Sequence, residues 1–223
     1  LIHAGTENEV KVVVKSIHSE YLDKENISKK LFQLDGIIVA PGFGQRGLDG
    51  KILAVEFARV NKIPFLGICL GMQMAVIEYA RNVKKMRYAN STEISEKCKD
   101  PVIDLMTSQK EIINKGGTMR LGAWDCELEK NTKSYKSYKK KLISERHRHR
   151  YEFNNNYTDK IFDDKFIIAG SNPDTKLVEI VENIDHPWFV GVQFHPEYKS
   201  SVYNPHPIFV NFVKASLKNY LNK

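Results

Sequence analysis

Cysteine is scarce in this chain, with three residues in 223, at positions 69, 98 and 126. An odd number of widely spaced cysteines excludes a disulfide framework, and no two of them lie close enough together to form a zinc-binding pair. Such usage is typical of a reducing compartment. We therefore expect a cytoplasmic protein without a metal site.

Long apolar runs are missing as well. The most apolar stretch, residues 65–80, is shorter than the roughly 20 residues that a transmembrane helix needs, and Gln73 and Glu78 interrupt it. The sequence therefore predicts no membrane segment. With 42% hydrophobic and 10% aromatic residues, the chain can bury one sizeable core, so we expect a single globular domain over residues 1–223.

Acidic residues are outnumbered, since 27 Asp and Glu stand against 34 Lys and Arg and give a formal net charge of +7. Much of the excess lies in the low-complexity segment at residues 133–141. A short lysine run is more typical of a solvated segment than of a nucleic-acid surface. We interpret it as an exposed or mobile loop and expect no nucleic-acid partner.

The first part of the chain alternates between two patterns. Apolar and β-branched runs at residues 10–15, 36–40 and 65–68 predict buried strands, and helical spacing of apolar residues predicts helices at 48–61 and 70–81. This alternation predicts an α/β fold with an open, mostly parallel central sheet flanked by helices.

After residue 81 the pattern changes to polar segments and shorter strands, which predict a smaller antiparallel portion. A helical repeat follows at residues 208–221. The strands of this part are expected at 119–128, 147–153, 166–170, 177–181 and 188–194.

One cysteine stands in a setting that favours chemistry. The sequence G-I-C-L-G at residues 67–71 places Cys69 between two glycines where a predicted strand meets a predicted helix, which is the layout of a nucleophile elbow. The positive end of the helix dipole favours the thiolate, the reactive form of cysteine. Cys69 is therefore the candidate nucleophile, and we interpret Cys98 and Cys126 as bystanders.

A thiol nucleophile needs a base, and the base needs a group that fixes its tautomer. The tripeptide His195-Pro196-Glu197 directly follows a predicted strand and supplies both groups, with His195 as the base and Glu197 as its hydrogen-bond acceptor. Alone the tripeptide is weak, but together with Cys69 it predicts a catalytic triad.

A glycine-containing loop, P-G-F-G at residues 41–44, follows the strand predicted at 36–40. It therefore lies at the carboxyl edge of the sheet, where open α/β folds bind their ligands. The loop has neither the P-loop signature nor the glycine pattern of dinucleotide-binding folds. Beside a nucleophile, such a loop is suited to supply an amide to an oxyanion hole.

The segment R-H-R-H-R at residues 146–150 alternates two residue types. On a strand, its three arginines would share one face and its two histidines the other. Taken alone, the segment could be a solvated strand, an RNA-binding stripe or a metal site, although no cysteine or carboxylate cluster of ligand spacing lies near it.

The motifs around Cys69 and His195 resemble the two signatures of the class I, or triad, glutamine amidotransferases, G-I-C-L-G-M-Q at 67–73 and F-H-P-E at 194–197. Three further segments are similar to the glutaminase domains of CTP synthases, and the basic segment is the most specific of them. They are N-S-T-E at 90–93, G-G-T-M-R-L-G at 116–122 and E-R-H-R-H-R-Y-E-F-N at 145–154. The resemblance runs from Leu1 to the C-terminal helix.

The resemblance implies a role for nine residues. Cys69 would attack the side-chain amide of L-glutamine, His195 would shuttle the proton, and Glu197 would orient His195. The implied oxyanion hole consists of the backbone amides of Gly42 and Leu70. The implied glutamine-binding residues are Phe43, through its backbone, Gln73, Glu93 and Arg150.

The sequence departs from the family pattern in two places. Pro41 stands where the family more often has glycine, and the strand and most of the helix that open the family's domain do not precede residue 1. Residues 1–5 themselves read as the last turn of a helix closed by Gly5. We therefore expect a C-terminal fragment of a longer enzyme, with the first strand of the sheet missing.

The resemblance further implies an absent N-terminal synthetase domain, in which UTP is phosphorylated by ATP with magnesium and becomes CTP. The glutaminase domain would need no cofactor of its own, GTP would act as an effector, and the full-length enzyme would be a homotetramer. Two other interpretations remain open. One is a stand-alone cysteine hydrolase or peptidase of the same fold, and the other is a basic nucleic-acid-binding module built around residues 146–150.

Overall fold

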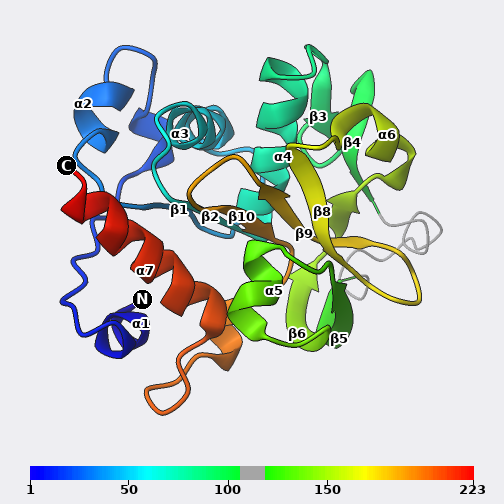
Figure 1. Cartoon of the computed structure of the whole chain (residues 1–223). Coiled ribbons are helices and arrows are strands. Elements are labelled where there is room, and N and C mark those ends of the chain that lie inside the picture. The colour runs from blue at the N-terminus through cyan, green and yellow to red at the C-terminus, as the bar shows by residue number, and fades with distance from the viewer. Residues whose placement is uncertain (106–118) are drawn as a thin grey trace.

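The computed structural model describes residues 1–105 and 119–223, and Figure 1 shows a central twisted sheet with helices on both sides. The sheet has seven strands in the order β1-β2-β10-β9-β8-β5-β6. Their bounds are β1 Ile37–Val39, β2 Phe65–Ile68, β10 Phe189–Val192, β9 Val178–Asn183, β8 Phe166–Ser171, β5 Arg120–Leu128 and β6 Leu142–His149.

This sheet is mixed. The strands β1, β2 and β10 run parallel, whereas β10, β9, β8, β5 and β6 pair antiparallel in succession. The predicted α/β fold, with a sheet flanked by helices, is confirmed. The antiparallel portion is larger than expected, and it is part of the central sheet. Only the three strands at one end of this sheet form parallel pairs.

A second, smaller sheet contains β3 Ala89–Ser91, β4 Asp100–Leu105 and β7 Tyr151–Phe153. The prediction of one strand over residues 147–153 was wrong, because the pairing changes partners within it. The strand β6 pairs with β5 as far as His149, and β7 pairs with β4 from Tyr151 onward. Arg150 lies at the break between the two sheets.

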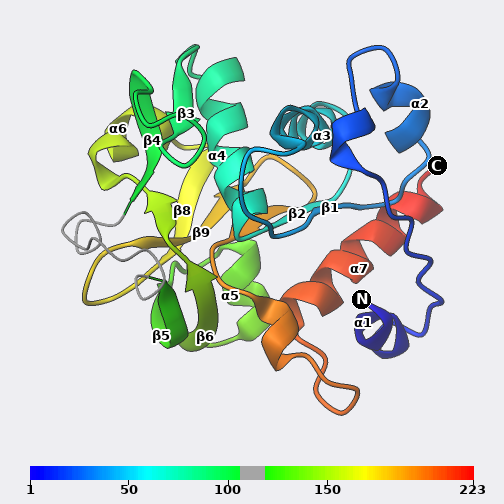
Figure 2. The same ribbon diagram turned by 180° about the vertical axis from the view of Figure 1, so that it is seen from behind.

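Two layers of helices cover the parallel strands (Figures 1 and 2). The helices α3 Leu48–Val60 and α4 Leu70–Asn82 pack on one face, while α1 Ile2–Glu7 and α7 Pro207–Leu221 pack on the other. Alternate residues of β2 serve the two cores, since Phe65 lies in the first and Leu66 in the second. Short helices complete the fold: α2 Ile27–Leu31, α5 Lys133–Tyr138 and α6 Thr158–Ile161.

None of the helices in residues 1–105 and 119–223 has the length and apolarity needed to cross a bilayer.

The strand expected at residues 10–15 was wrong, because this segment has no regular structure. Val10 and Val12 pack against the core beneath α7, whereas Val13 and Val14 are 79% and 59% exposed. A β-branched sequence becomes a strand only where a neighbouring strand supplies hydrogen bonds. The described residues supply none here.

The segment at residues 133–141 was also predicted wrongly, since its first part is the helix α5. The hydroxyl of Thr132 caps the helix by accepting a hydrogen bond from the amide of Tyr135 at 3.0 Å. The buried carboxylate of Glu182 accepts from the amides of Lys133 and Ser134 at 2.8 and 2.7 Å. An acceptor far away in the sequence therefore stabilises the helix amino end.

The helix at the start of the chain does not end at Gly5, as expected, but continues to Glu7. Gly5 has a packing role instead. A Cβ atom at this position would lie 2.8 Å from the carbonyl oxygen of Val10, so glycine lets the following segment fold back against α1.

A buried ion pair joins the helices α3 and α4. Glu78 of α4 is fully buried, and its carboxylate accepts hydrogen bonds from Arg59 of α3 through Nε at 2.8 Å and Nη2 at 2.6 Å. Asn82 donates a third hydrogen bond to Glu78 at 3.0 Å. A buried carboxylate with its cation removed is strongly destabilising.

We predict that Arg59→Met lowers the free energy of unfolding by about 3 kcal/mol, because Glu78 is left charged and unpaired. Urea unfolding followed by circular dichroism measures the change. The matched control is Arg46→Met, which removes an exposed pair with Glu20 and is expected to cost less than about 1 kcal/mol. Equal losses in the two variants would contradict the prediction.

Candidate active site

The predicted nucleophile elbow is present. Cys69 lies between the last residue of β2 and the first of α4, with φ 51° and ψ −104°. A non-glycine residue in such a conformation is strained by roughly 1–3 kcal/mol, which the surrounding packing must offset. The turn is sharp because the chain reverses from strand to helix at this single residue.

The two glycines of the motif are needed for close packing. A Cβ atom on Gly67 would lie 2.6 Å from the backbone of Gly71, and one on Gly71 would lie 2.1 Å from the carbonyl oxygen of Val39. Both approaches are closer than real Cβ contacts allow. The amino end of α4 is therefore pressed directly onto β1 and β2, and this contact places Cys69.

The surroundings of Cys69 disfavour its thiolate. The residue is 3% exposed, and burial raises the pKa of its thiol to about 12. The negative charges of Glu197 and Glu93 raise it further, while the backbone amide of Leu70 and the charge of Lys51 lower it. In the resting state the sulfur therefore carries its proton, and a base is required to remove it.

His195 forms the expected pair with Glu197. Nδ1 of His195 lies 2.6 Å from Oε1 of Glu197. The carboxylate can only accept, so Nδ1 carries the proton and Nε2 is left as the acceptor. Nε2 is buried and has no hydrogen-bond partner among the described residues. His195 therefore has the tautomer that a general base requires.

Gln193 was not predicted. Its side chain is fully buried, its Nε2 lies 3.6 Å from the sulfur of Cys69, and its oxygen accepts a hydrogen bond from Gln73 at 3.3 Å. The sequence carried one signal for it, since Gln193 is the single polar residue between the apolar strand β10 and His195. Gln73 thus holds the amide of Gln193 in the orientation in which it contacts the sulfur.

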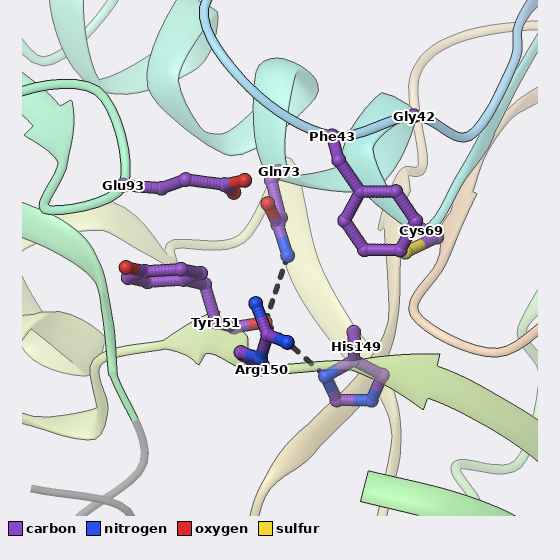
Figure 3. Close-up of a pocket in the computed structure, with 8 residues that line it drawn as sticks. All are labelled: Gly42, Phe43, Cys69, Gln73, Glu93, His149, Arg150 and Tyr151. Carbon is purple, nitrogen blue, oxygen red and sulfur yellow. Dashed lines mark hydrogen bonds between the residues drawn. The ribbon is translucent and has the colours of Figure 1, made fainter. Parts of the chain in front are cut away.

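Six of the nine predicted residues line one small cavity, which Figure 3 shows. They are Gly42, Phe43, Cys69, Gln73, Glu93 and Arg150. The remaining wall is formed by His149 and Tyr151, which were not predicted. The pair His195 and Glu197 lies outside this wall, and Leu70 contributes its amide from behind Cys69.

The cavity is small. Its volume is about 20 Å³, which accommodates about one water molecule. The ring of Phe43 projects from its loop on the Cys69 side (Figure 3), is 54% exposed, and has the guanidinium of Arg148 5.9 Å from its centre. A larger ligand therefore requires side chains such as that of Phe43 to move aside.

Opposite charges face the cavity from two sides. Oε1 of Glu93 accepts a hydrogen bond from the amide of Gly44 at 3.0 Å, so this carboxylate also ties down the glycine loop. Arg150 enters from the break between β6 and β7, and its Nε is buried without a partner in the described part of the chain. A zwitterion could be held between these two groups.

The two histidines of the basic segment are buried, whereas Arg146 and Arg148 are exposed, so the predicted alternation is confirmed for these four residues. It was wrong for the third arginine, because Arg150 follows the end of β6 and lines the cavity. Burial lowers the pKa of His149 to about 3 and that of His147 to about 2, so both rings are neutral. Nδ1 of His147 lies 2.9 Å from Nε2 of His149.

These neutral rings form a chain of hydrogen bonds with defined tautomers. Nδ1 of His149 lies 3.2 Å from the carbonyl oxygen of Tyr151 and must donate to it. Nε2 of His149 then accepts from Nδ1–H of His147. The same Tyr151 carbonyl also accepts from Nε2 of Gln73 at 2.8 Å (Figure 3). The histidines thus support the amide that lines the cavity.

The described residues contain no group of three or more His, Cys, Asp or Glu arranged to hold a metal ion. Part of one sequence segment singled out above, residues 116–118, lies outside the described residues.

Comparison with known proteins agrees with this geometry. The family described as glutamine amidotransferase class-I matches residues 1–215. The CTP synthase of Christiangramia forsetii is 60% identical over 215 residues, which are 96% of this chain and 39% of that protein. The CTP synthase of Flavobacterium johnsoniae is 60% identical over 216 residues, 97% of this chain and 40% of that protein. The chain thus spans about 40% of the length of these relatives.

Solved structures give the same result. The glutaminase domain of Trypanosoma brucei CTPS with bound acivicin superposes with a TM-score of 0.90 at 38% identity, covering 97% of this chain and 84% of that one. A glutamine amidotransferase of Thermotoga maritima, with a TM-score of 0.51 and 13% identity over 94% of this chain and 96% of that one, shares the fold. The chain therefore belongs to the class-I glutamine amidotransferases and, within them, to the glutaminase domains of the CTP synthase family.

Proposed function

We propose that the chain hydrolyses the side-chain amide of L-glutamine through a thioester on Cys69. The observation that carries this proposal is the meeting of three groups in one cavity, the thiol of Cys69, the carboxylate of Glu93 and the guanidinium of Arg150. A free amino acid presents an α-ammonium and an α-carboxylate, which these two charged side chains complement. A peptide bond offers neither charge at the same place.

The reaction proceeds in two halves. His195 takes the proton of Cys69, and the sulfur attacks the carboxamide carbon while the carbonyl π electrons move to oxygen. The imidazolium returns the proton to the amide nitrogen, and the C–N bond breaks. Ammonia departs, and the glutamyl group remains bound to Cys69 as a thioester. His195 then deprotonates a water that attacks the thioester, which releases glutamate and the thiol.

The remaining residues act on charge and position. The amides of Gly42 and Leu70 donate to the oxyanion that forms in both halves. Gln73, the backbone of Phe43, Glu93 and Arg150 hold the amino-acid end of glutamine. Displacement of the Phe43 ring opens the cavity to the substrate.

We further propose that the ammonia serves CTP formation. The relatives named CTP synthase are longer than this chain. In the full-length protein an accompanying synthetase domain would use ATP, magnesium and UTP. GTP would act as effector, and the full-length enzyme would be a homotetramer. The three cysteines are free thiols, which supports a reducing, cytoplasmic location.

A chloroketone analogue of glutamine is predicted to label Cys69 and neither Cys98 nor Cys126. The sulfur bonds to the methylene carbon and chloride leaves. Peptide mass spectrometry locates the adduct, and acivicin is a second probe of the same pocket. L-Glutamine is expected to slow the labelling, with L-leucine as control. Protection by peptides in place of glutamine would instead indicate a peptidase.

The triad geometry predicts that Glu197→Gln lowers kcat of glutamine hydrolysis at least about 100-fold, because the imidazole loses its anionic partner and can adopt the wrong tautomer. KM should change much less. Glutamate release from the full-length enzyme is the measurement, and Glu129→Gln, an exposed carboxylate outside the site, is the control. An unchanged kcat would remove Glu197 from the mechanism.

The histidine chain predicts a change of a different kind. In His149→Phe the carbonyl of Tyr151, which also accepts from Gln73, loses one of its two donors and is held less firmly, so KM for glutamine should rise about tenfold while kcat falls less. His149→Asn keeps an N–H donor near the position of Nδ1 and should recover most of the effect. A KM that is unchanged in His149→Phe but raised in His149→Asn would show that the ring acts by its volume.

A further inference from the structure

A cation stands close to the nucleophile without a partner of its own among the described residues. Lys51 lies in the first turn of α3, and its ammonium reaches the glycine loop, because a Cβ atom built on Gly42 would lie 3.2 Å from its Nζ. The same Cβ atom would lie 3.4 Å from the side chain of Leu70. Lys51 therefore lies beside the glycine loop at the point where Gly42 approaches the side chain of Leu70.

Two other partly buried cations in the described residues have partners of their own, unlike Lys51. Arg59 is held by Glu78, and Nζ of Lys133 donates to the carbonyls of Asn183 and Ile184. Lys51 has no hydrogen bond or ion pair with any described residue, and burial lowers its pKa. Removing an ammonium from water without a partner costs free energy, so a charge that appears during function would be its natural complement.

The charges around Cys69 create the need for such a cation. Glu93 faces the sulfur from the loop after β3, and Glu197 faces it from the turn after β10. Both are negative and oppose the thiolate, whereas Lys51 on α3 and the amide of Leu70 on α4 favour it. The influence is mutual, because the charge of Cys69 in turn favours the protonated form of Lys51.

We propose that Lys51 is a further residue of the hydrolytic machinery, a fixed positive charge that stabilises the thiolate of Cys69 and the oxyanion held between Gly42 and Leu70. It acts through space and transfers no proton. The inference rests on the proposed function for the oxyanion, but the effect on the thiolate is a property of the site itself. It can therefore be measured without any turnover of glutamine.

The test is the pH dependence of alkylation by iodoacetamide, in which the sulfur bonds to the methylene carbon and iodide leaves. Only the thiolate reacts, so the rate reports the ionised fraction. Peptide mass spectrometry follows Cys69 and, as an internal reference, Cys98 from pH 7 to pH 10. The variants are Lys51→Met, Lys51→Gln and Lys51→Arg, with Lys214→Met, an exposed lysine of α7, as control.

In Lys51→Met and Lys51→Gln, alkylation of Cys69 is expected to slow about tenfold throughout this range, because the loss of the opposite charge raises the thiol pKa. Lys51→Arg should stay within about threefold of the original rate, and Cys98 and Lys214→Met should be unchanged. Two results would overturn the proposal: equal rates in the original chain and the neutral variants, or an arginine variant as slow as the methionine variant.

Circular dichroism establishes which variants fold, and the glutamine variant decides the outcome if the methionine variant does not. A failure of the proposed function gives a separate result. In that case glutamine does not protect Cys69 from the chloroketone, whereas the dependence of alkylation on Lys51 is still observed.

Discussion

The contact between the amino end of α4 and the ends of β1 and β2 is the constraint on which the site depends. Gly71 lies against the carbonyl oxygen of Val39, and no side chain fits between them. This contact holds Cys69 in its strained conformation. It also directs the backbone amide of Leu70 at the sulfur. One turn further along the cavity wall it places Gln73, whose backbone amide donates to the carbonyl oxygen of Cys69.

The strand order explains how distant segments meet at this point. The strands β1, β2 and β10 are the parallel part of the sheet and lie side by side. Their carboxyl ends carry the loop with Gly42, the proposed nucleophile Cys69 and the proposed base His195, respectively. Ligands of open α/β sheets bind at this edge. The rest of the sheet is antiparallel, yet its strand β6 ends at His149 and delivers Arg150 to the same cavity.

Features determined by neighbouring residues could be predicted from the sequence. The elbow needs glycines two residues before and after Cys69, and Glu197 reaches His195 across one residue, so both motifs are local. Strand β2 was predicted with its observed bounds for the same reason.

Features that depend on distant partners could not be predicted. The helix α5 is stabilised at its start by Glu182, and the segment at residues 10–15 has no neighbouring strand in the described chain. The break at Arg150 follows from two different pairing partners, β5 and β4. Gln193 and Lys51 reach Cys69 only through the fold. The nucleophile was therefore visible in the sequence, but its electrostatic surroundings were not.

Those surroundings explain why the thiol and the imidazole must ionise together. With the proton on sulfur, the site contains the negative charges of Glu197 and Glu93, and burial keeps the pKa of Cys69 near 12. In the proposed mechanism the proton moves to His195, whose imidazolium is then paired with Glu197, while the charge of Lys51 favours the thiolate that remains. Each new charge thus has an opposite charge nearby, which lowers the cost of forming the ion pair in a largely buried site. On this proposal Cys69 is a protonated thiol at rest and becomes a thiolate only together with the imidazolium.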